Sequence, residues 1–199
     1  RAESEFKALV DQSAGDNRAL APALKDLGKA QAKAQKSRES IETLRRALRV
    51  AGAEAGVRAE IYEIITELYR ANHELPVLVK EIEKEHPNDF GRLALLGALY
   101  EETGDPKSAI ASYRRALAIN PKHIDVRLKL VRILQSQGEL DLAIAEYEGL
   151  IRAAPNNPQF VFEHCDALMQ RGDRPRALKL LTELEARATG DEEVLARRA

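Results

Sequence analysis

The sequence lacks several features that indicate common functional classes. It has one cysteine, Cys165, so an intramolecular disulfide and a cysteine-rich metal site are both excluded. It has no tryptophan and only 5% aromatic residues, so the core must be built from many small aliphatic contacts. No run approaches the roughly 20 apolar residues that cross a bilayer, so we expect no membrane insertion.

An excess of charge of one sign is also lacking. The 31 lysine and arginine residues are balanced by 32 aspartate and glutamate residues, for a formal net charge of −1. A nucleic-acid binder normally carries a clear excess of basic side chains, because it must neutralise phosphates. We therefore expect no nucleic-acid partner. The lone cysteine favours a cytoplasmic location, and because the chain opens at Arg1 we expect its native N-terminus to lie upstream.

The sequence is rich in helix-forming residues that are arranged in short amphipathic runs. Between Phe90 and Pro121, apolar residues recur at steps of three and four in two runs, which indicates two helices. Gly104 ends the first run, because glycine adopts the left-handed cap conformation cheaply. Pro106 suits the first turn of a helix, and Pro121 ends the second run. This segment is therefore predicted to be a helical hairpin.

The hairpin pattern recurs at a fixed period of 34 residues. Gly104 is followed by Gly138 and Gly172 at this spacing. The series that carries the pattern consists of Gly97, Tyr100, Gly104, Ala109, Tyr113, Ala116 and Pro121. This period and series resemble the tetratricopeptide repeat. The resemblance implies an all-α fold, an α-α superhelix (solenoid) of stacked antiparallel helix pairs, and protein binding as the general function.

The repeat divides the chain into five hairpins and two partial ones. We expect hairpins at residues 21–55, 56–89, 90–123, 124–157 and 158–191. The second is divergent, because Arg70 and Leu75 stand at its glycine and alanine positions. Residues 1–14 have the spacing of a second helix from a preceding hairpin, and residues 191–199 that of a following or capping helix. We therefore expect the chain to be a fragment of a longer array.

The resemblance also implies where a ligand binds. In that family, the second, fifth, ninth and twelfth positions of the repeat line a concave groove that holds peptides. The residues that we expect to line it are Ala94, Ala98, Glu101, Leu128, Arg132, Gln135, Phe162, Asp166 and Met169. Phe162 and Met169 supply exposed apolar surface there, unless they pack against the next helix instead. The lysine and asparagine that clamp chaperone tails in some members are absent from these positions.

One stretch, His164-Cys165-Asp166, contains residue types found in catalytic sites. Adjacent helical residues point about 100° apart, so the thiol and the imidazole do not converge as a Cys–His pair must. The four histidines have no metal-binding spacing, and no phosphate-binding glycine loop is present. We therefore expect no enzyme activity, no cofactor and no metal site.

The sequence leaves three functional hypotheses ahead of a fourth, an RNA-binding superhelix, which the neutral charge opposes. The favoured one is a protein-interaction scaffold that binds a peptide or partner protein in the groove. A second is a regulatory or substrate-docking segment of a larger multidomain enzyme. A third is a self-assembly module that forms homo-oligomers through the ends of the array. A catalytic domain in the full-length gene product would support the second hypothesis. A rise in molecular mass with concentration, measured by light scattering, would support the third.

Overall fold

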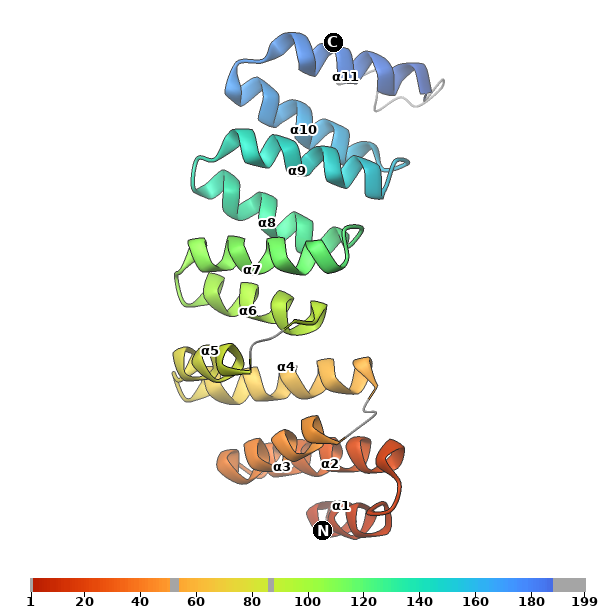
Figure 1. Ribbon diagram of the computed structural model, residues 1–199, viewed down its shortest axis with the longest axis vertical. Coiled ribbons are helices and arrows are strands. Elements are labelled where there is room, and N and C mark those ends of the chain that lie inside the picture. The colour runs from red at the N-terminus through yellow and green to blue at the C-terminus, as the bar shows by residue number, and fades with distance from the viewer. Residues whose placement is uncertain (1, 51–53, 86–87, 188–199) are drawn as a thin grey trace. The chain divides into compact units, whose positions relative to one another are not determined.

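The computed structural model describes residues 2–50, 54–85 and 88–187, which form helices joined by short connections (Figure 1). These described residues contain eleven α-helices and no strand, which confirms the all-α class. The helices are α1 (Ala2–Gln12), α2 (Asn17–Lys33), α3 (Ser37–Arg49), α4 (Ala55–Ala71), α5 (Leu75–Lys84), α6 (Phe90–Glu102), α7 (Pro106–Ile119), α8 (Ile124–Ser136), α9 (Leu140–Ala153), α10 (Pro158–Arg171) and α11 (Arg174–Arg187).

The chain divides into two compact units, and the boundary falls inside α5. The first unit runs from Arg1 to Glu81 and the second from Ile82 to Ala199. In the first unit α1 packs against α2, α2 packs against α3, and α4 contacts both α2 and α3. In the second unit each helix from α6 to α10 packs against the helix that follows it. Helix-on-helix packing between chain neighbours therefore builds each unit.

In the second unit, helix ends follow signals that are visible in the sequence. The Asp105 carboxylate accepts a hydrogen bond from the N–H of Ser108 at 3.1 Å, which caps the start of α7. The turns before α7, α9 and α11 have φ angles of 82°, 74° and 87° at Gly104, Gly138 and Gly172. Glycine has no Cβ and adopts this left-handed conformation without strain, so the turn predicted at Gly104 is confirmed.

The first unit makes the same turn without glycine. Gln35, between α2 and α3, has a φ of 60°, and His73, between α4 and α5, has a φ of 59°. The 34-residue spacing placed the second of these turns at Arg70, but α4 continues past that residue to Ala71. The turn comes later than expected because α4 is longer than its counterpart α6, with 17 residues against 13.

The two ends of the array differ in how much the structure describes. At the start, α1 packs against α2. α2 begins at Asn17, before the boundary expected at residue 21, because the Asp16 carboxylate caps it through the N–H of Arg18 at 2.9 Å. The helix expected at residues 191–199 and the end of the hairpin expected at residues 158–191 lie outside the described residues.

Close packing inside two of the hairpins depends on a glycine in the first helix. A Cβ added to Gly97 would lie 2.3 Å from Cε1 of Tyr113, so the tyrosine ring occupies the space that glycine leaves. In the first unit, a Cβ on Gly28 would lie 2.6 Å from the Leu44 side chain. The Ser40 hydroxyl also donates a hydrogen bond to the Gly28 carbonyl at 2.7 Å. The two helices of a hairpin therefore approach closely at these glycines.

Candidate protein-binding surface

The residues predicted to line a groove lie on the first helices of three successive hairpins in the second unit. We call them the first-helix stripe: Ala94, Ala98 and Glu101 of α6, Leu128, Arg132 and Gln135 of α8, and Phe162, Asp166 and Met169 of α10. Within each helix they are separated by three or four residues, so they share one face. Glu101, Arg132, Asp166 and Met169 are exposed, and Ala94, Ala98, Leu128 and Gln135 are half-buried.

Phe162 requires a correction, because its side chain is only 1% exposed. The ring is therefore part of the interior and does not offer surface to a ligand. Burying a phenylalanine side chain contributes about 1.5–3 kcal/mol, which favours this placement. Met169, its neighbour along the stripe, is 50% exposed. Of the two residues for which the sequence left both readings open, only Met169 presents apolar surface.

Two buried tyrosines bring their hydroxyl groups to the stripe. The Tyr113 hydroxyl donates a hydrogen bond to Oε2 of Glu101 at 3.0 Å. Tyr147 stands at the same repeat position in the next hairpin, where burial raises the pKa of its hydroxyl and the Gln135 side chain lowers it. Burial raises the pKa of Tyr113 above its usual value and that of Tyr147 to about 12. Both hydroxyl groups therefore stay protonated at neutral pH.

Charged side chains of α8 and α10 act on the Tyr147 hydroxyl. After burial, the carboxylates of Glu163 and Asp166 raise the pKa of Tyr147, and the guanidinium of Arg132 lowers it. On α8 and α10 the stripe therefore carries both signs of charge.

The stripe becomes apolar at α10. Met169 stands at the repeat position that Glu101 holds in α6 and Gln135 holds in α8. Leu181 likewise stands where the two preceding hairpins have the tyrosines. A polar pair of side chains is thus replaced by an apolar pair, and half of the Met169 side chain remains open to solvent. A ligand that runs along the stripe meets polar groups first and then an apolar contact.

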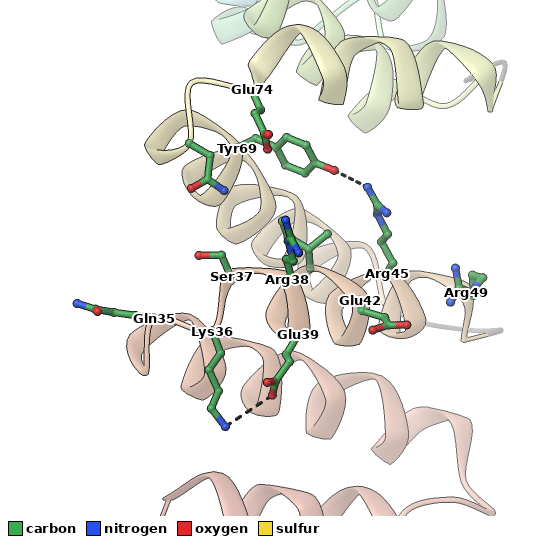
Figure 2. A pocket seen from close by; sticks show the side chains of 12 residues that line it. Gln35, Lys36, Ser37, Arg38, Glu39, Glu42, Arg45, Arg49, Tyr69 and Glu74 are labelled. Atoms are coloured by element: carbon green, nitrogen blue, oxygen red, sulfur yellow. Dashed lines mark hydrogen bonds and ion pairs between the residues drawn. The ribbon is translucent and has the colours of Figure 1, made fainter.

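The first unit contains a cleft that the sequence analysis did not identify. It has a volume of about 1010 Å³ and lies between α3 and the turn that joins α4 to α5. Figure 2 shows Arg45 reaching from α3 toward the Tyr69 hydroxyl. The same guanidinium contacts Oε2 of Glu81 at 2.5 Å, and the Tyr69 hydroxyl donates to that carboxylate at 2.9 Å. Burial and this hydrogen bond raise the pKa of Tyr69 to about 12.

The cleft lies along a charged face of α3. The charged residues on this face, separated by three or four positions, are Arg38, Glu42, Arg45 and Arg49. At the corresponding places in α7, alanines Ala111 and Ala118 replace Glu42 and Arg49. Long charged side chains keep their heads in water, so charged groups line this cleft. The charge pattern of α3 is the signal from which the cleft could have been anticipated.

Cys165 has no features of a catalytic nucleophile. Its side chain is 4% exposed, and its Sγ lies 3.5 Å from the carbonyl oxygen of Ala177. Burial raises the pKa of the thiol to about 11, so the reactive thiolate is scarce at neutral pH. No group of three or more His, Cys, Asp or Glu side chains among the described residues could hold a metal ion. None of the helices in the described part of the chain is long and apolar enough to span a bilayer.

The curated relatives match part of this chain and a small part of their own length. Cellulose synthase operon protein C of Pseudomonas fluorescens (strain SBW25) is 35% identical over 71 residues, which are 36% of this chain and 6% of that protein. TPR repeat-containing protein MJ1428 of Methanocaldococcus jannaschii is 32% identical over 85 residues, which are 42% of this chain and 15% of that protein.

Solved structures resemble this chain along nearly its whole length. The tetratricopeptide protein YrrB, described as having an unusual peptide-binding site, superimposes with a TM-score of 0.57 at 16% identity and covers 99% of both chains. A structure of MamA from AMB-1 has a TM-score of 0.57 at 18% identity and covers 90% of this chain and 97% of that one. At these identities the likeness shows the fold, a solenoid of stacked helix pairs.

The family model for the tetratricopeptide repeat matches residues 100–161 and 136–199, which together make up half of the chain. These matches cover the turns at Gly104, Gly138 and Gly172. The chain belongs to the tetratricopeptide repeat family.

Proposed function

We propose that this chain is a protein-interaction scaffold that binds an extended peptide, or an extended segment of a partner protein, along the first-helix stripe. The fold supports this proposal because stacked helix pairs present long, continuous surfaces to other chains. The stripe offers hydrogen-bonding groups, both signs of charge and one apolar anchor, which together suit a peptide better than a small metabolite.

The observation that carries the proposal is that α8 and α10 each present an exposed side chain of opposite charge. Arg132 of α8 and Asp166 of α10 are both exposed. A ligand that crosses these two hairpins therefore meets a guanidinium and a carboxylate. The half-exposed Met169 lies one turn beyond Asp166 on the same helix and gives an apolar residue of the ligand a place to pack.

The stripe also gives the bound segment a preferred charge pattern. Glu101 and Asp166 are acidic and flank the basic Arg132 along the order of the hairpins. We expect the ligand to carry the opposite order, which is basic, acidic and basic, followed by a large apolar residue. Complementary order of charges sets register and specificity more than it sets affinity. A uniformly acidic or uniformly basic peptide should therefore bind poorly.

The experiment is a selection from a random peptide library displayed on phage, with the full chain as bait. The test variant combines Arg132→Glu with Met169→Asp, which reverses the central charge and removes the apolar anchor. The matched control combines Arg114→Glu with Leu142→Asp, which makes the same changes on the second helices α7 and α9. Leu142 is 41% exposed, close to the 50% of Met169, so the control changes the exposed apolar surface to a similar degree.

We expect peptides enriched on the unmodified chain to bind the control variant and to lose about tenfold or more in affinity for the stripe variant. Circular dichroism should show equal helix content in all three proteins. Peptides that bind the stripe variant as tightly as the unmodified chain would remove the stripe from consideration. If the peptides bind the stripe variant but not the control variant, the binding surface lies on the second helices instead.

A second candidate function is a docking segment within a larger protein. The observation that favours it is the small share of the curated relatives that aligns, 6% and 15% of their lengths. If the chain is such a segment, the stripe should bind a peptide from the same polypeptide. The test is to add the remaining regions of the full-length gene product in trans, which should compete with the selected peptides.

A further inference from the structure

His164 is a buried polar residue whose hydrogen-bonding groups have no partner. It lies on α10, and its side chain is 2% exposed. Neither Nδ1 nor Nε2 has a hydrogen-bond partner within the described residues. Leaving a buried polar group unpaired costs about 1–3 kcal/mol. Its ring is stacked on Tyr147, with centroids 6.1 Å apart, but this contact does not satisfy the two nitrogens.

Three other hairpins show that this position does not require a polar side chain. Stepping back by 34 residues from His164 gives Leu130, and a second step gives Leu96. These leucines are 0% and 3% exposed and belong to the ordinary core. In the first hairpin the corresponding residue is Leu27, which is 6% exposed. The histidine therefore replaces a leucine that would pack without any unpaired group, and packing alone does not account for it.

His164 lies in the wall of an open pocket of about 350 Å³. The pocket lies between the second helices α9 and α11, so it is formed by residues other than those of the first-helix stripe. Ile151 of α9 and Leu180 of α11 contribute apolar walls. The charged residues that line it are Glu148 and Arg152 of α9 and Arg176, Lys179 and Glu183 of α11.

The rim of this pocket carries a basic group that has no ionic partner. Glu148 is already paired, with Arg176 at 3.4 Å and with Arg152 at 3.9 Å. Arg176 also pairs with Asp173 at 3.6 Å. These pairs are long and at least one side chain of each is exposed, so they exchange easily for a better partner. Lys179 forms no ion pair within the described residues, and neither does Glu183. Lys179 is thus a cation on the rim of the pocket, near the buried imidazole, with which an anionic ligand can pair.

We propose that the pocket between α9 and α11 binds a carboxylate group, with the His164 ring donating a hydrogen bond to it and Arg176 and Lys179 neutralising its charge. The carbon atoms next to the carboxylate pack between Ile151 and Leu180, whose side chains form the apolar walls. Binding supplies the missing partner for one ring nitrogen, which is the physical reason for a histidine at a leucine position. The carboxylate belongs to an acidic peptide side chain or to a free organic acid.

Binding should be coupled to uptake of a proton. Burial lowers the pKa of His164 below its ordinary value of 6.5, and the nearby Arg176 lowers it further, while Glu148 raises it. Arg152, Lys179 and Glu183 are the other charged groups of the pocket. A bound carboxylate adds a negative charge beside the ring and favours the imidazolium. Affinity should therefore increase as the pH falls from about 7 toward 5.5, where the ligand itself is still ionised.

The test is an NMR titration of the histidine ring signals in the full chain. The chain has four histidines, so His164 can be assigned by the signal that disappears in His164→Leu. The probes are glutarate and N-acetyl-glutamate amide, and N-acetyl-glutamine amide is the uncharged control. We expect both carboxylates to shift the His164 signal saturably and to raise its titration midpoint, and the glutamine compound to do neither.

Three variants separate binding from folding. His164→Leu restores the leucine of the other hairpins, so it should fold at least as stably and should lose binding. Arg176→Gln with Lys179→Gln should weaken binding by about tenfold, because two charge-assisted contacts are lost. The control pair Lys107→Gln with Arg114→Gln removes the same number of charges from α7 and should leave affinity unchanged. Thermal unfolding of each variant checks that it is folded.

The outcomes decide the proposal directly. No saturable shift of the His164 signal with either carboxylate would overturn it. Undiminished binding by His164→Leu or by the rim variant, measured for all variants by isothermal titration calorimetry, would also overturn it. Tighter binding of the glutamate compound than of glutarate would assign the carboxylate to a peptide, and the reverse would assign it to a free acid. The first-helix stripe is not altered by these variants, so this test can fail while peptide binding at the stripe persists.

Discussion

At the scale of single residues, Gly97 determines how closely α6 and α7 approach each other. Gly97→Ala would place a Cβ 2.3 Å from the Tyr113 ring, which is itself 0% exposed and has nowhere to move. Overpacking of this kind costs about 1–3 kcal/mol, which outweighs the gain of up to about 1 kcal/mol in helix propensity. We expect a lower urea midpoint for the second unit, measured by circular dichroism.

Gly91→Ala on the same helix is the matched control. The nearest atom to a Cβ at Gly91 is Oδ1 of Asp89 at 3.6 Å, which is ordinary contact. Helix propensity then acts alone, so this variant should be as stable as the unmodified chain or slightly more stable. A loss of stability at Gly91 equal to that at Gly97 would contradict the close-approach explanation.

His164 makes stability depend on pH, because burial lowers its pKa in the folded chain. Below about pH 6.5 the unfolded chain binds a proton that the folded chain does not, so the free energy of unfolding falls as the pH falls. One such group contributes a slope of up to about 1.4 kcal/mol per pH unit. We expect urea denaturation at pH 7 and pH 5 to show a smaller loss of stability in His164→Leu than in the unmodified chain. An equal loss of unfolding free energy in both proteins between pH 7 and pH 5 would contradict the lowered pKa of His164 in the folded chain.

Single residues also show what a repeat pattern leaves undecided. The pattern placed Phe162 and Met169 on the same face of α10, yet one is buried and the other is half-exposed. Periodicity gives the direction of a side chain within its helix, but burial depends on which neighbouring element covers it. His164 shows the same limit, because the sequence identified it only as part of an unsuitable catalytic triplet. Comparison with Leu130 at the same repeat position was the available signal.

At the scale of helices, Arg127 links α8 to α9 and to the turn before α8. Its guanidinium pairs with Glu146 of α9 and donates to the Pro121 carbonyl at 2.6 Å. The side chains of Arg127 and Glu146 are 13% and 19% exposed. Glu146→Ala leaves a mostly buried cation without its carboxylate, so we expect a loss of about 2–3 kcal/mol in the free energy of unfolding.

Glu67→Ala serves as the comparison for this ion pair. Glu67 pairs with Arg70 on α4, and the two side chains are 73% and 41% exposed. An exposed pair contributes about 0.2–1 kcal/mol, so this variant should change the denaturation midpoint far less. If both substitutions cost the same, the burial of the Arg127 pair has no energetic importance.

The sequence predicted helices best where local chemistry alone determines them. Gly104 in the turn before α7 and Asp105 at the start of that helix act through their own backbone geometry, so they were readable from the residues. The turns at Gln35 and His73 were not, because residues other than glycine adopt the left-handed conformation there. Backbone hydrogen bonds from Lys36 to Gln31 and from Glu74 to Tyr69 close these turns. The extra length of α4 displaced the second of these turns by about one helical turn from its expected place.

At the scale of the whole molecule, the repeat architecture explains why the family was readable from the sequence and the binding surface was not. Each hairpin packs mainly on its chain neighbours, so many positions recur at one period and together identify the fold. We expect binding residues at positions that vary between hairpins, as Glu101, Gln135 and Met169 do at one repeat position. A fixed repeat period carries no information about such positions, so it does not identify a ligand.

The most direct test of the scaffold proposal is site-specific photo-crosslinking from the stripe. A benzoylphenylalanine introduced at Met169 reports on the stripe, and one at Leu142 reports on a similarly exposed apolar site of a second helix. In a lysate of the source organism, we expect a discrete crosslinked polypeptide from position 169 that an excess of selected peptide displaces, and none from position 142. The same crosslinks from both positions, or crosslinks from position 142 alone, would contradict binding along the first-helix stripe.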